Sequence, residues 1–426
     1  MLAFKGGTPL RIKPFTRWPI QGSEEARRLI EVLGSGKWGF DGPQEKEFAQ
    51  KFAAYCGARD ALCVANGSVS LEIALRALGI GPGDEVIVPA LTWVATAWAV
   101  VQVGATPVFA DVREQDWCLD PASFREKITP RTRAVIPVHL YSQMAEMDEI
   151  LAIAGKHSIE VIEDCAHAHG FQWKGKGAGT LGAVGSYSFQ QSKVMTAGEG
   201  GALVTNRPEL AGHIYSLKNC GRKRTPNSPY GFGGNYRMTD FQAAVLIAQL
   251  ERLDEQLATK SANERIFRSQ VQQISGLEVL AQKSAVTRQG MYGLALRFDP
   301  GLFANVPVDL LVDALHAEGI PVQRTYDVVY RSPLWTPGAR TVKLGPGENP
   351  MVRLGLNGRC PVAERIAAEG LVVLHHVFLG SADDMADLAA GFAKVQANAG
   401  ELRFDVLQKK MRRTGRSLLR KAAFRT

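Results

Sequence analysis

The sequence predicts an α/β protein whose larger part is a mostly parallel, seven-stranded sheet between helices. Between residues 61 and 205, short apolar runs alternate with helix-like segments, and strands that alternate with helices form parallel sheets covered on both faces. The chain has 426 residues, which is enough for two or three domains. A long helical pattern from Thr239 towards Ile274 indicates a bridge into a second, smaller α+β part.

The first part of the chain carries the regular alternation. Helical patterns at 24–34 and 44–55 come first, and the second of them is ended by Cys56-Gly57. The seven strands are expected at 61–65, 85–89, 106–110, 134–139, 160–164, 185–189 and 201–205. The helices that separate most of them are expected at 70–78, 96–103, 121–127 and 147–157. Each strand is short and apolar, as buried strands of a parallel sheet are.

The second part is less regular. Its elements are expected as a strand at 292–299, a helix at 308–318, a Pro-rich stretch at 331–350, a helix at 362–370, a strand at 371–374 and a helix at 383–397. The domain organisation that follows is an N-terminal arm (1–22), a large domain (23–255), a small C-terminal domain (256–400) and a basic tail (401–426).

The net charge of +8 comes from the C-terminal end, because residues 403–426 hold nine lysines and arginines and one acid. The rest of the chain is formally neutral, so it has no basic bias that would indicate nucleic-acid binding. Apolar residues at 404, 407, 411, 418 and 422 predict a basic amphipathic helix in the tail. We interpret this helix as an extension packed on the body; contact with an anionic membrane is the alternative.

The location is expected to be cytoplasmic. The apolar runs are too short to span a membrane, and the N-terminus has no apolar segment long enough for a secretory signal. The chain has six cysteines, and no two of them form a CxxC pair. Their spacing therefore indicates neither a zinc site nor a disulfide framework. Reduced thiols are typical of a cytoplasmic protein.

Chemistry is expected where the strands end, because open parallel sheets bind ligands beyond the carboxyl ends of their strands. Asn66-Gly67-Ser68 follows the first strand and opens a helix, so its free N–H groups can hold an anion. The alternative is a helix cap by Ser68 or Ser70. Trp93 follows the second strand and can stack on a planar ring, or it can belong to the core.

Two further strand ends carry ionisable groups. Asp164 closes an apolar strand and therefore needs a cationic partner, which a protonated pyridine nitrogen would supply. His167 follows within reach of a neighbouring ring oxygen. A metal site of Asp164, His167 and His169 is the alternative, and we expect no metal because further ligand clusters are lacking.

Lys193 lies in SYSFQQSKVMTAGEGG, a run of small and polar residues before an apolar strand. A desolvated lysine forms Schiff bases, whereas an ordinary surface lysine is the alternative for this segment alone. Ser188 precedes it by five residues and can bind an anion. A phosphate cradle, a stacking aromatic, a buried carboxylate and a Schiff-base lysine at successive strand ends describe a pyridoxal 5'-phosphate site.

At these residues the sequence resembles the DegT/DnrJ/StrS family of sugar aminotransferases over roughly residues 5–400. The matching segments are 66–93, 104–112, 136–148, EDCAHAHG (163–170), SFQQSKVMTAGEGGALVTN (188–206) and GGNYRMTDFQAAV (233–245). The resemblance implies a fold-type-I pyridoxal phosphate enzyme. It also implies an aminotransferase that works by ping-pong transfer through pyridoxamine phosphate.

The resemblance implies roles for individual residues. Lys193 would bind the cofactor covalently, and Asp164 would pair with its ring nitrogen. The other cofactor contacts would come from His167 at the ring hydroxyl, Trp93 on the ring face, Gly67, Ser68 and Ser188 at the phosphate, and Asn235 at the phosphate of the neighbouring subunit. The last contact implies a homodimer with shared sites. Candidate substrate-binding residues are Trp38, Gln190, His375 and His376.

Two departures from the family pattern narrow the substrate. Gln190 stands where many relatives carry histidine, and LHHVF (374–378) replaces a Leu-Pro-x-x-Pro pattern. Both resemble the branch that acts on keto-cyclitols, including scyllo-inosose, and takes the amino group from L-glutamine. We therefore expect transfer from L-glutamine or L-glutamate to a keto-cyclitol or ketosugar in natural-product biosynthesis. The alternatives are a nucleotide-ketosugar aminotransferase, a dehydratase of the same fold, and a non-catalytic cofactor-binding regulator.

Overall fold

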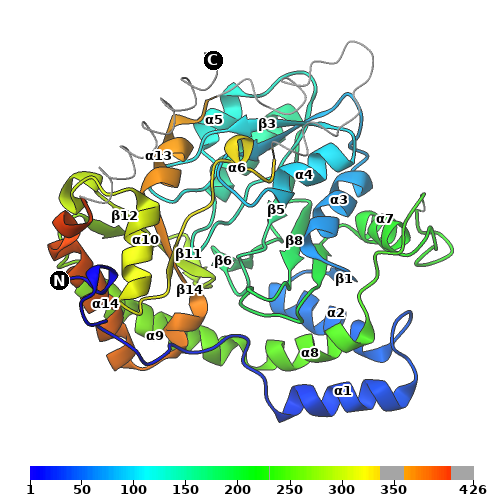
Figure 1. The fold of residues 1–426 in the computed structure, drawn as a ribbon. Helices are drawn as coiled ribbons and strands as arrows, with labels where there is room; N and C mark the ends of the chain where they lie inside the picture. The colour runs from blue at the N-terminus through cyan, green and yellow to red at the C-terminus, as the bar shows by residue number, and fades with distance from the viewer. Residues whose placement is uncertain (230, 336–358, 404–426) are drawn as a thin grey trace, which may run out of the picture.

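A computed structural model describes residues 1–229, 231–335 and 359–403 of the chain. Its largest feature is a seven-stranded sheet, in agreement with the expected fold class (Figure 1). The strands are β1 (Asp60–Val64), β2 (Glu85–Pro89), β3 (Thr106–Ala110), β4 (Thr132–Val135), β5 (Glu160–Asp164), β8 (Val184–Ser188) and β9 (Gly201–Thr205). Their order is β1-β9-β8-β5-β4-β2-β3, and β9 runs antiparallel to both of its neighbours while the other pairs are parallel.

The central strands form because their residues suit burial on both faces. Every residue of β2, EVIVP, is buried, and so is every residue of β8 and β9. The helices of this part are α1 (Ser23–Ser35), α2 (Pro43–Cys56), α3 (Gly67–Ala77), α4 (Ala95–Gln102), α5 (Pro121–Glu126), α6 (Met147–His157), α7 (Pro208–Lys218) and α8 (Asp240–Glu251). Helix α3 packs on β8 and β9 and contacts α4 and α7, so its N-terminus stands at the carboxyl edge of the sheet.

A second, antiparallel sheet lies beside the first. Its order is β10-β12-β14-β13, made of β10 (Leu277–Val279), β12 (Gly293–Phe298), β13 (Val322–Arg324) and β14 (Gly370–Leu374). The helices of this part are α9 (Leu253–Val271), α10 (Val308–Ala317), α13 (Pro361–Glu369) and α14 (Ala382–Ala397). Short 3-10 helices are η1 (Ala3–Lys5), η2 (Pro300–Phe303), η3 (Val329–Arg331), η4 (His375–Leu379) and η5 (Ala399–Leu402).

A small third sheet connects the two parts, because β11 (Val286–Arg288) of the second part pairs with β6 (Gln172–Trp173) of the first, and β6 pairs with β7 (Lys176–Gly177). The buried apolar side chains of both parts form one continuous core. None of the described helices is both long enough and apolar enough to cross a membrane.

The long helix expected from Thr239 to Ile274 is in fact two helices. Arg252, with φ −101° and ψ 0°, separates α8 from α9. The break lets α8 pack on α1 and α2, while α9 packs on α14 and η4 of the second part (Figure 1). A single straight helix would have to pack on α1 and α2 and also on α14 and η4 along one axis. The expected boundary at residue 255 therefore falls in the first turn of α9.

The two ends of the chain pack on the second part. Leu2 is fully buried and its N–H donates to Glu401 Oε2 at 2.9 Å. Arg11 pairs with Asp384 and Asp387 of α14. From there the arm runs to α1 (Figure 1). Leu402 is fully buried, so the packed part extends past the expected edge at residue 400. The expected tail helix lies outside the described residues, as does the Pro-rich stretch from residue 336 to 350.

Candidate active site

One cavity of about 690 Å³ opens at the carboxyl ends of the large sheet. It is lined by the N-terminus of α3, the loop after β2, the end of β5, the loop between β8 and β9, and two tyrosines from the second part. Eight of the predicted residues line it, namely Gly67, Ser68, Trp93, Asp164, His167, Ser188, Gln190 and Lys193. These residues are up to 126 positions apart in the chain, from Gly67 to Lys193. They meet because the carboxyl ends of parallel strands lie at the same edge of the sheet.

Lys193 lies in the loop that follows β8. Its backbone N–H donates to the Gln190 carbonyl at 2.8 Å, and the residue is 9% exposed. Nζ lies 4.6 Å from the ring centroid of Tyr292. Burial lowers the pKa of Lys193 to about 8, and the negative charge of Asp164 opposes this shift. A fraction of the amine is therefore unprotonated near neutral pH, which a nucleophilic lysine requires.

Asp164 ends β5 and is buried at the floor of the cavity. Its Oδ2 accepts a hydrogen bond from Thr96 Oγ1 at 2.9 Å, and Oδ1 accepts one from the Ala166 N–H at 3.1 Å. Burial raises the pKa of Asp164, while these two donors and the Lys193 charge oppose the rise. The carboxylate is thus held in place by two neutral donors, and a cationic ring nitrogen in the cavity would stabilise it further.

His167 is held as a neutral imidazole of one tautomer. The Tyr141 backbone N–H donates to Nδ1 at 3.2 Å, so the ring proton resides on Nε2. The ring stacks on Tyr292 with centroids 3.6 Å apart and planes 13° apart. Burial lowers the pKa of His167 well below its usual range. Nε2–H lies 3.4 Å from the Tyr326 hydroxyl and can donate to an oxygen bound in the cavity.

The N-terminus of α3 forms the polar end of the cavity. Asn66 caps the helix, with Oδ1 accepting from the Val69 N–H at 2.9 Å, so the alternative of a cap by Ser68 or Ser70 does not hold. The first turn leaves the N–H groups of Gly67 and Ser68 directed outward. A Cβ at Gly67 would lie 2.6 Å from Ser188 Cβ, so only glycine permits this approach. The free N–H groups and the Ser188 hydroxyl together suit a phosphate.

Trp93 belongs to the cavity wall and not to the core, because it is 49% exposed. Its ring centroid lies 5.7 Å from that of Tyr326, which stands on the opposite part of the fold. The two rings border the opening of the cavity. A planar ring bound above Asp164 would find Trp93 available for stacking.

A chain of polar groups connects the lysine loop to Tyr292. Ser192 Oγ donates to Gln190 Oε1 at 2.8 Å and lies 3.2 Å from the Tyr292 hydroxyl. The Ser192 N–H also donates to Gln190 Oε1 at 2.8 Å. The exposed Glu199 adds a carboxylate to the lining. These groups offer donors and acceptors to a hydroxylated substrate beside Lys193.

Four predicted residues lie outside the lining. Trp38 is half exposed and packs at 5.8 Å from Phe241, and Asn235 is exposed in a bridge to Asn219. His375 and His376 follow β14 in η4. β14 ends at Leu374, where the expected strand also ends. His375 Nε2 faces the Ser192 carbonyl at 3.1 Å, and His376 Nδ1 faces the Thr16 carbonyl at 2.8 Å.

Sequence reasoning missed several lining residues, among them Thr96, Tyr292 and Tyr326. Thr96 lies in the first turn of α4, the helix that follows β2, so the strand-end rule could have found it. Tyr292 and Tyr326 come from the second part, and no local pattern places them at the first sheet. Their part in the site is visible only once Tyr292, just before β12, and Tyr326, just after β13, are seen to line the same cavity as Asp164.

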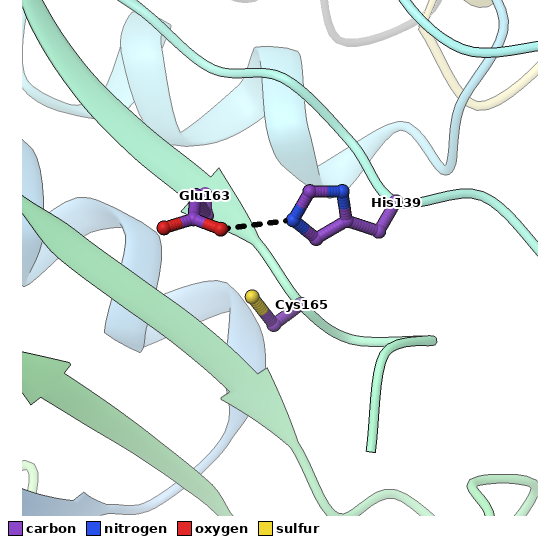
Figure 2. A group of neighbouring side chains, drawn as sticks. All are labelled: His139, Glu163 and Cys165. Atoms are coloured by element: carbon purple, nitrogen blue, oxygen red, sulfur yellow. Dashed lines mark hydrogen bonds and ion pairs between the residues drawn. The ribbon is translucent and has the colours of Figure 1, made fainter. Parts of the chain in front are cut away.

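One group of three side chains has the composition of a metal site among the residues that the structure describes: His139, Glu163 and Cys165 (Figure 2). The ring nitrogens of His139 and the carboxylate oxygens of Glu163 already have hydrogen-bond partners within the protein. His139 Nδ1 accepts from the Ala145 N–H, so Nε2–H donates to Glu163 Oε2 at 3.0 Å. The same carboxylate accepts the N–H groups of Gly179, Leu181 and Gly182. We assign this cluster a structural role in fixing the loop after β7.

Comparisons with known proteins agree with this geometry. The family described as the DegT/DnrJ/EryC1/StrS aminotransferase family matches residues 19–383. An L-glutamine:2-deoxy-scyllo-inosose aminotransferase of Streptoalloteichus tenebrarius is 38% identical over 421 residues, covering 94% of this chain and 99% of that relative. The Streptomyces fradiae enzyme of the same description is also 38% identical, over 423 residues with the same coverage. The crystal structure of 3-amino-5-hydroxybenzoic acid synthase superposes with a TM-score of 0.81 at 32% identity, covering 91% of this chain and all of that one.

Proposed function

Because this chain belongs to the DegT/DnrJ/EryC1/StrS aminotransferase family, and is therefore an aminotransferase, we propose that it binds pyridoxal 5'-phosphate in this cavity. We propose further that it moves an amino group from L-glutamine or L-glutamate to a keto-cyclitol. The observation that carries the proposal is the meeting of Lys193, Asp164 and His167 with the N-terminus of α3 in one cavity. A regulatory protein without turnover would have no need of a buried lysine with a pKa of about 8.

The residues present fit this cofactor. The free N–H groups of α3 with Ser68 and Ser188 suit its phosphate, and Lys193 is the amine that would bind it. Asp164 carries a buried carboxylate that forms no ion pair within the described part of the chain, which suits a protonated ring nitrogen. His167 offers Nε2–H to the ring hydroxyl and Trp93 offers a stacking face. When bound, pyridoxal phosphate supplies an electron-accepting ring and a carrier for the amino group.

The chain's own residues supply orientation and proton movement. Asp164 holds a proton on the ring nitrogen, because its carboxylate is fixed by Thr96 and Ala166. Lys193 Nζ takes a proton from the donor's Cα and returns it to the acceptor carbon. A pKa of about 8 makes both directions accessible near neutral pH. Tyr292 packs against both Lys193 and His167, which limits their movement.

The charge of the cavity favours an uncharged acceptor. Lys193 is the single lysine or arginine among the described residues of the lining, whereas Asp164 and Glu199 are acidic. A nucleotide-linked ketosugar carries a diphosphate, which proteins commonly hold with arginine or lysine. A keto-cyclitol carries hydroxyls, and Gln190, Ser192 and Tyr292 offer partners for them. The inosose substrates named for two relatives support the same preference.

We propose that the working unit is a homodimer with shared sites. Asn235 lies outside the cavity of its own chain and is exposed, so it is available to a second copy. Trp38 and Phe40 are half exposed on the loop between α1 and α2, and Phe232 is fully exposed. Apolar rings on a surface are typical of an interface. A cytoplasmic location is also proposed, since all six cysteines are unpaired.

A half-reaction screen tests the function. The enzyme is loaded with pyridoxal phosphate and treated with L-glutamine or L-glutamate, and the spectral change is followed. Keto-cyclitols, keto-hexoses and nucleotide ketosugars are then compared for reversal of that change. We expect reversal with a keto-cyclitol; reversal with nucleotide ketosugars alone would support the alternative substrate. No change with any amino donor would support the regulatory protein.

Borohydride reduction and peptide mapping test the lysine. We expect the pyridoxyl group on Lys193, and we expect Lys193→Ala to abolish turnover while keeping phosphate and stacking contacts. The matched control is Lys176→Ala, which removes an exposed lysine of β7. Labelling of Lys174, Lys176 or Lys218 in place of Lys193 would refute the assignment.

A further inference from the structure

Two side chains from outside the large sheet form hydrogen bonds with the backbone just before Lys193. Trp18 Nε1–H donates to the Gln191 carbonyl at 2.9 Å, and His375 Nε2 faces the Ser192 carbonyl at 3.1 Å. These are the two consecutive carbonyls before the lysine. Trp18 belongs to the N-terminal arm and His375 to η4, so the pair joins the arm and the second part of the fold to the lysine loop. We call Trp18 and His375 the carbonyl clamp.

The two members of the clamp fix one another. Their rings meet edge to face with centroids 4.5 Å apart, and His375 is fully buried. Because its Nε2 faces a carbonyl oxygen, that nitrogen carries the ring proton. Nδ1 has no partner among the described residues. The imidazole is therefore neutral and has one productive hydrogen bond, the one to Ser192.

His375 also anchors the tyrosine that packs against Lys193. Its backbone N–H donates to the Tyr292 carbonyl at 3.0 Å. The Tyr292 hydroxyl lies 3.2 Å from Ser192 Oγ, and its ring lies 4.6 Å from Lys193 Nζ. One residue thus holds both neighbours of the lysine, Ser192 through the imidazole and Tyr292 through the backbone.

A buried lysine lies behind the clamp. Lys260 of α9 is fully buried, its Nζ lies 5.4 Å from the Trp18 ring, and it has no hydrogen-bond partner among the described residues. The Trp18 face is a favourable neighbour for an ammonium. Burial lowers the pKa of His375 well below its usual range, and the charge of Lys260 lowers it further. Lys260 thereby favours the neutral, donating form of the clamp histidine.

We propose that His375 is a positioning residue for Lys193, acting through the Ser192 carbonyl with Trp18 as its partner. The proposal rests on the proposed function, because it treats Lys193 as the reacting amine. His375 is not among the residues that line the cavity. Its contribution is to keep the loop between β8 and β9 in the conformation that aims Nζ. Misplacement of a reacting group by about 1 Å costs up to about a hundredfold in rate.

Two substitutions separate the hydrogen bond from the bulk of the ring. His375→Gln can place an amide N–H near the position of Nε2, whereas His375→Leu fills similar space without a donor. The control is His316→Leu. His316 is an exposed histidine of α10, and its Nε2 also faces a backbone carbonyl, that of Val322. Thermal unfolding of each full-length variant reports its folding.

The first readout needs no cofactor. Full-length protein is reductively methylated with formaldehyde and cyanoborohydride, and the rate at Lys193 is compared with that at exposed Lys176 in the same sample by peptide mapping. The second readout is kcat and KM of the amino-donor half-reaction with the loaded enzyme. We expect His375→Leu to change the Lys193 to Lys176 ratio and to lower kcat by about tenfold or more at nearly constant KM. We expect His375→Gln to restore most of both.

Three results would overturn the proposal. The first is a folded His375→Leu protein with an unchanged ratio and kcat, and the second is His375→Gln impaired as much as His375→Leu. The third is an equal loss in His316→Leu. Should His375→Leu fail to fold, Trp18→Phe keeps the ring contacts and drops the Nε1–H bond to Gln191; an unchanged ratio and kcat there would also overturn it. Failure of the proposed function itself is seen separately, as pyridoxyl labelling of wild-type protein elsewhere than Lys193.

Discussion

The amine of Lys193 lies 4.6 Å from the ring centroid of Tyr292, a residue 99 positions later in the chain and the first before a strand of the other sheet. The ring of Tyr292 also stacks on the ring of His167, with the two centroids 3.6 Å apart. Tyr292 is therefore the point where the second part of the fold holds two candidate catalytic groups of the first. The cavity is a joint product of both sheets.

Tyr292→Ala should lower kcat of the half-reaction by about tenfold, because an aromatic contact is worth about 0.5–1.5 kcal/mol and both Lys193 and His167 lose one. Tyr292→Phe keeps the ring and loses only the hydroxyl contact to Ser192, so its loss should be smaller. Stopped-flow spectra of the loaded enzyme provide the measurement. Equal losses in the two variants would show that the hydroxyl, and not the ring, matters.

The amine of Lys193 should titrate near pH 8 in the protein without cofactor, well below an ordinary lysine at about 10.4. Asp164→Asn should move this midpoint lower still, since the carboxylate charge raises the lysine pKa. The labelling rate of Lys193 against pH, followed by peptide mapping, gives both midpoints. A midpoint that rises in Asp164→Asn contradicts the electrostatic coupling of the two residues.

Lys260→Met should stabilise the protein below pH 7. Burial lowers the pKa of Lys260 to about 7 from an ordinary 10.5, so the unfolded chain binds more protons between these values. The wild-type penalty is thus complete below pH 7 and fades as pH rises towards 10.5. We expect a gain of about 2 kcal/mol or more at pH 6, shrinking towards pH 10, in denaturant unfolding. A gain independent of pH would mean that packing, and not charge, is responsible.

Mixing Lys193→Ala with Asn235→Ala should restore part of the activity. A hybrid dimer holds one site that has both an intact lysine and an intact asparagine, if Asn235 serves the neighbouring copy. The measurement is turnover after subunit exchange, with exchange itself followed by native mass spectrometry. Two inactive parents that exchange without regaining turnover would rule out a shared site.

A chain that ends after Arg403 should keep its fold and turnover, whereas one that ends at Gly400 should be less stable. The shorter chain loses Leu402, which is fully buried, and Glu401, which binds the Leu2 N–H and the terminal amine. Loss of a buried leucine costs about 2–5 kcal/mol. Thermal unfolding of the two chains side by side tests this, and equal stability would count against the packing of the two ends.

The sequence by itself determined the large sheet and eight of the residues that line the cavity. The reason is that a buried strand of a parallel sheet can be recognised as a short apolar run. The residues that follow such strands lie at one edge of the sheet. Gly67, Trp93, Asp164 and Lys193 could thus be placed together without coordinates. The identity of Asn66 as the cap of α3 was a local detail that several neighbouring polar residues could equally have supplied.

Only the tertiary structure decided what the second part contributes. Tyr292 and Tyr326 reach the cavity because the antiparallel sheet stands beside the parallel one, and no periodicity within either segment encodes that placement. The break at Arg252 was likewise set by packing partners distant in sequence. His375 became interpretable only once it was seen against Ser192, 183 residues away, since a hydrogen bond between remote segments leaves no pattern in either.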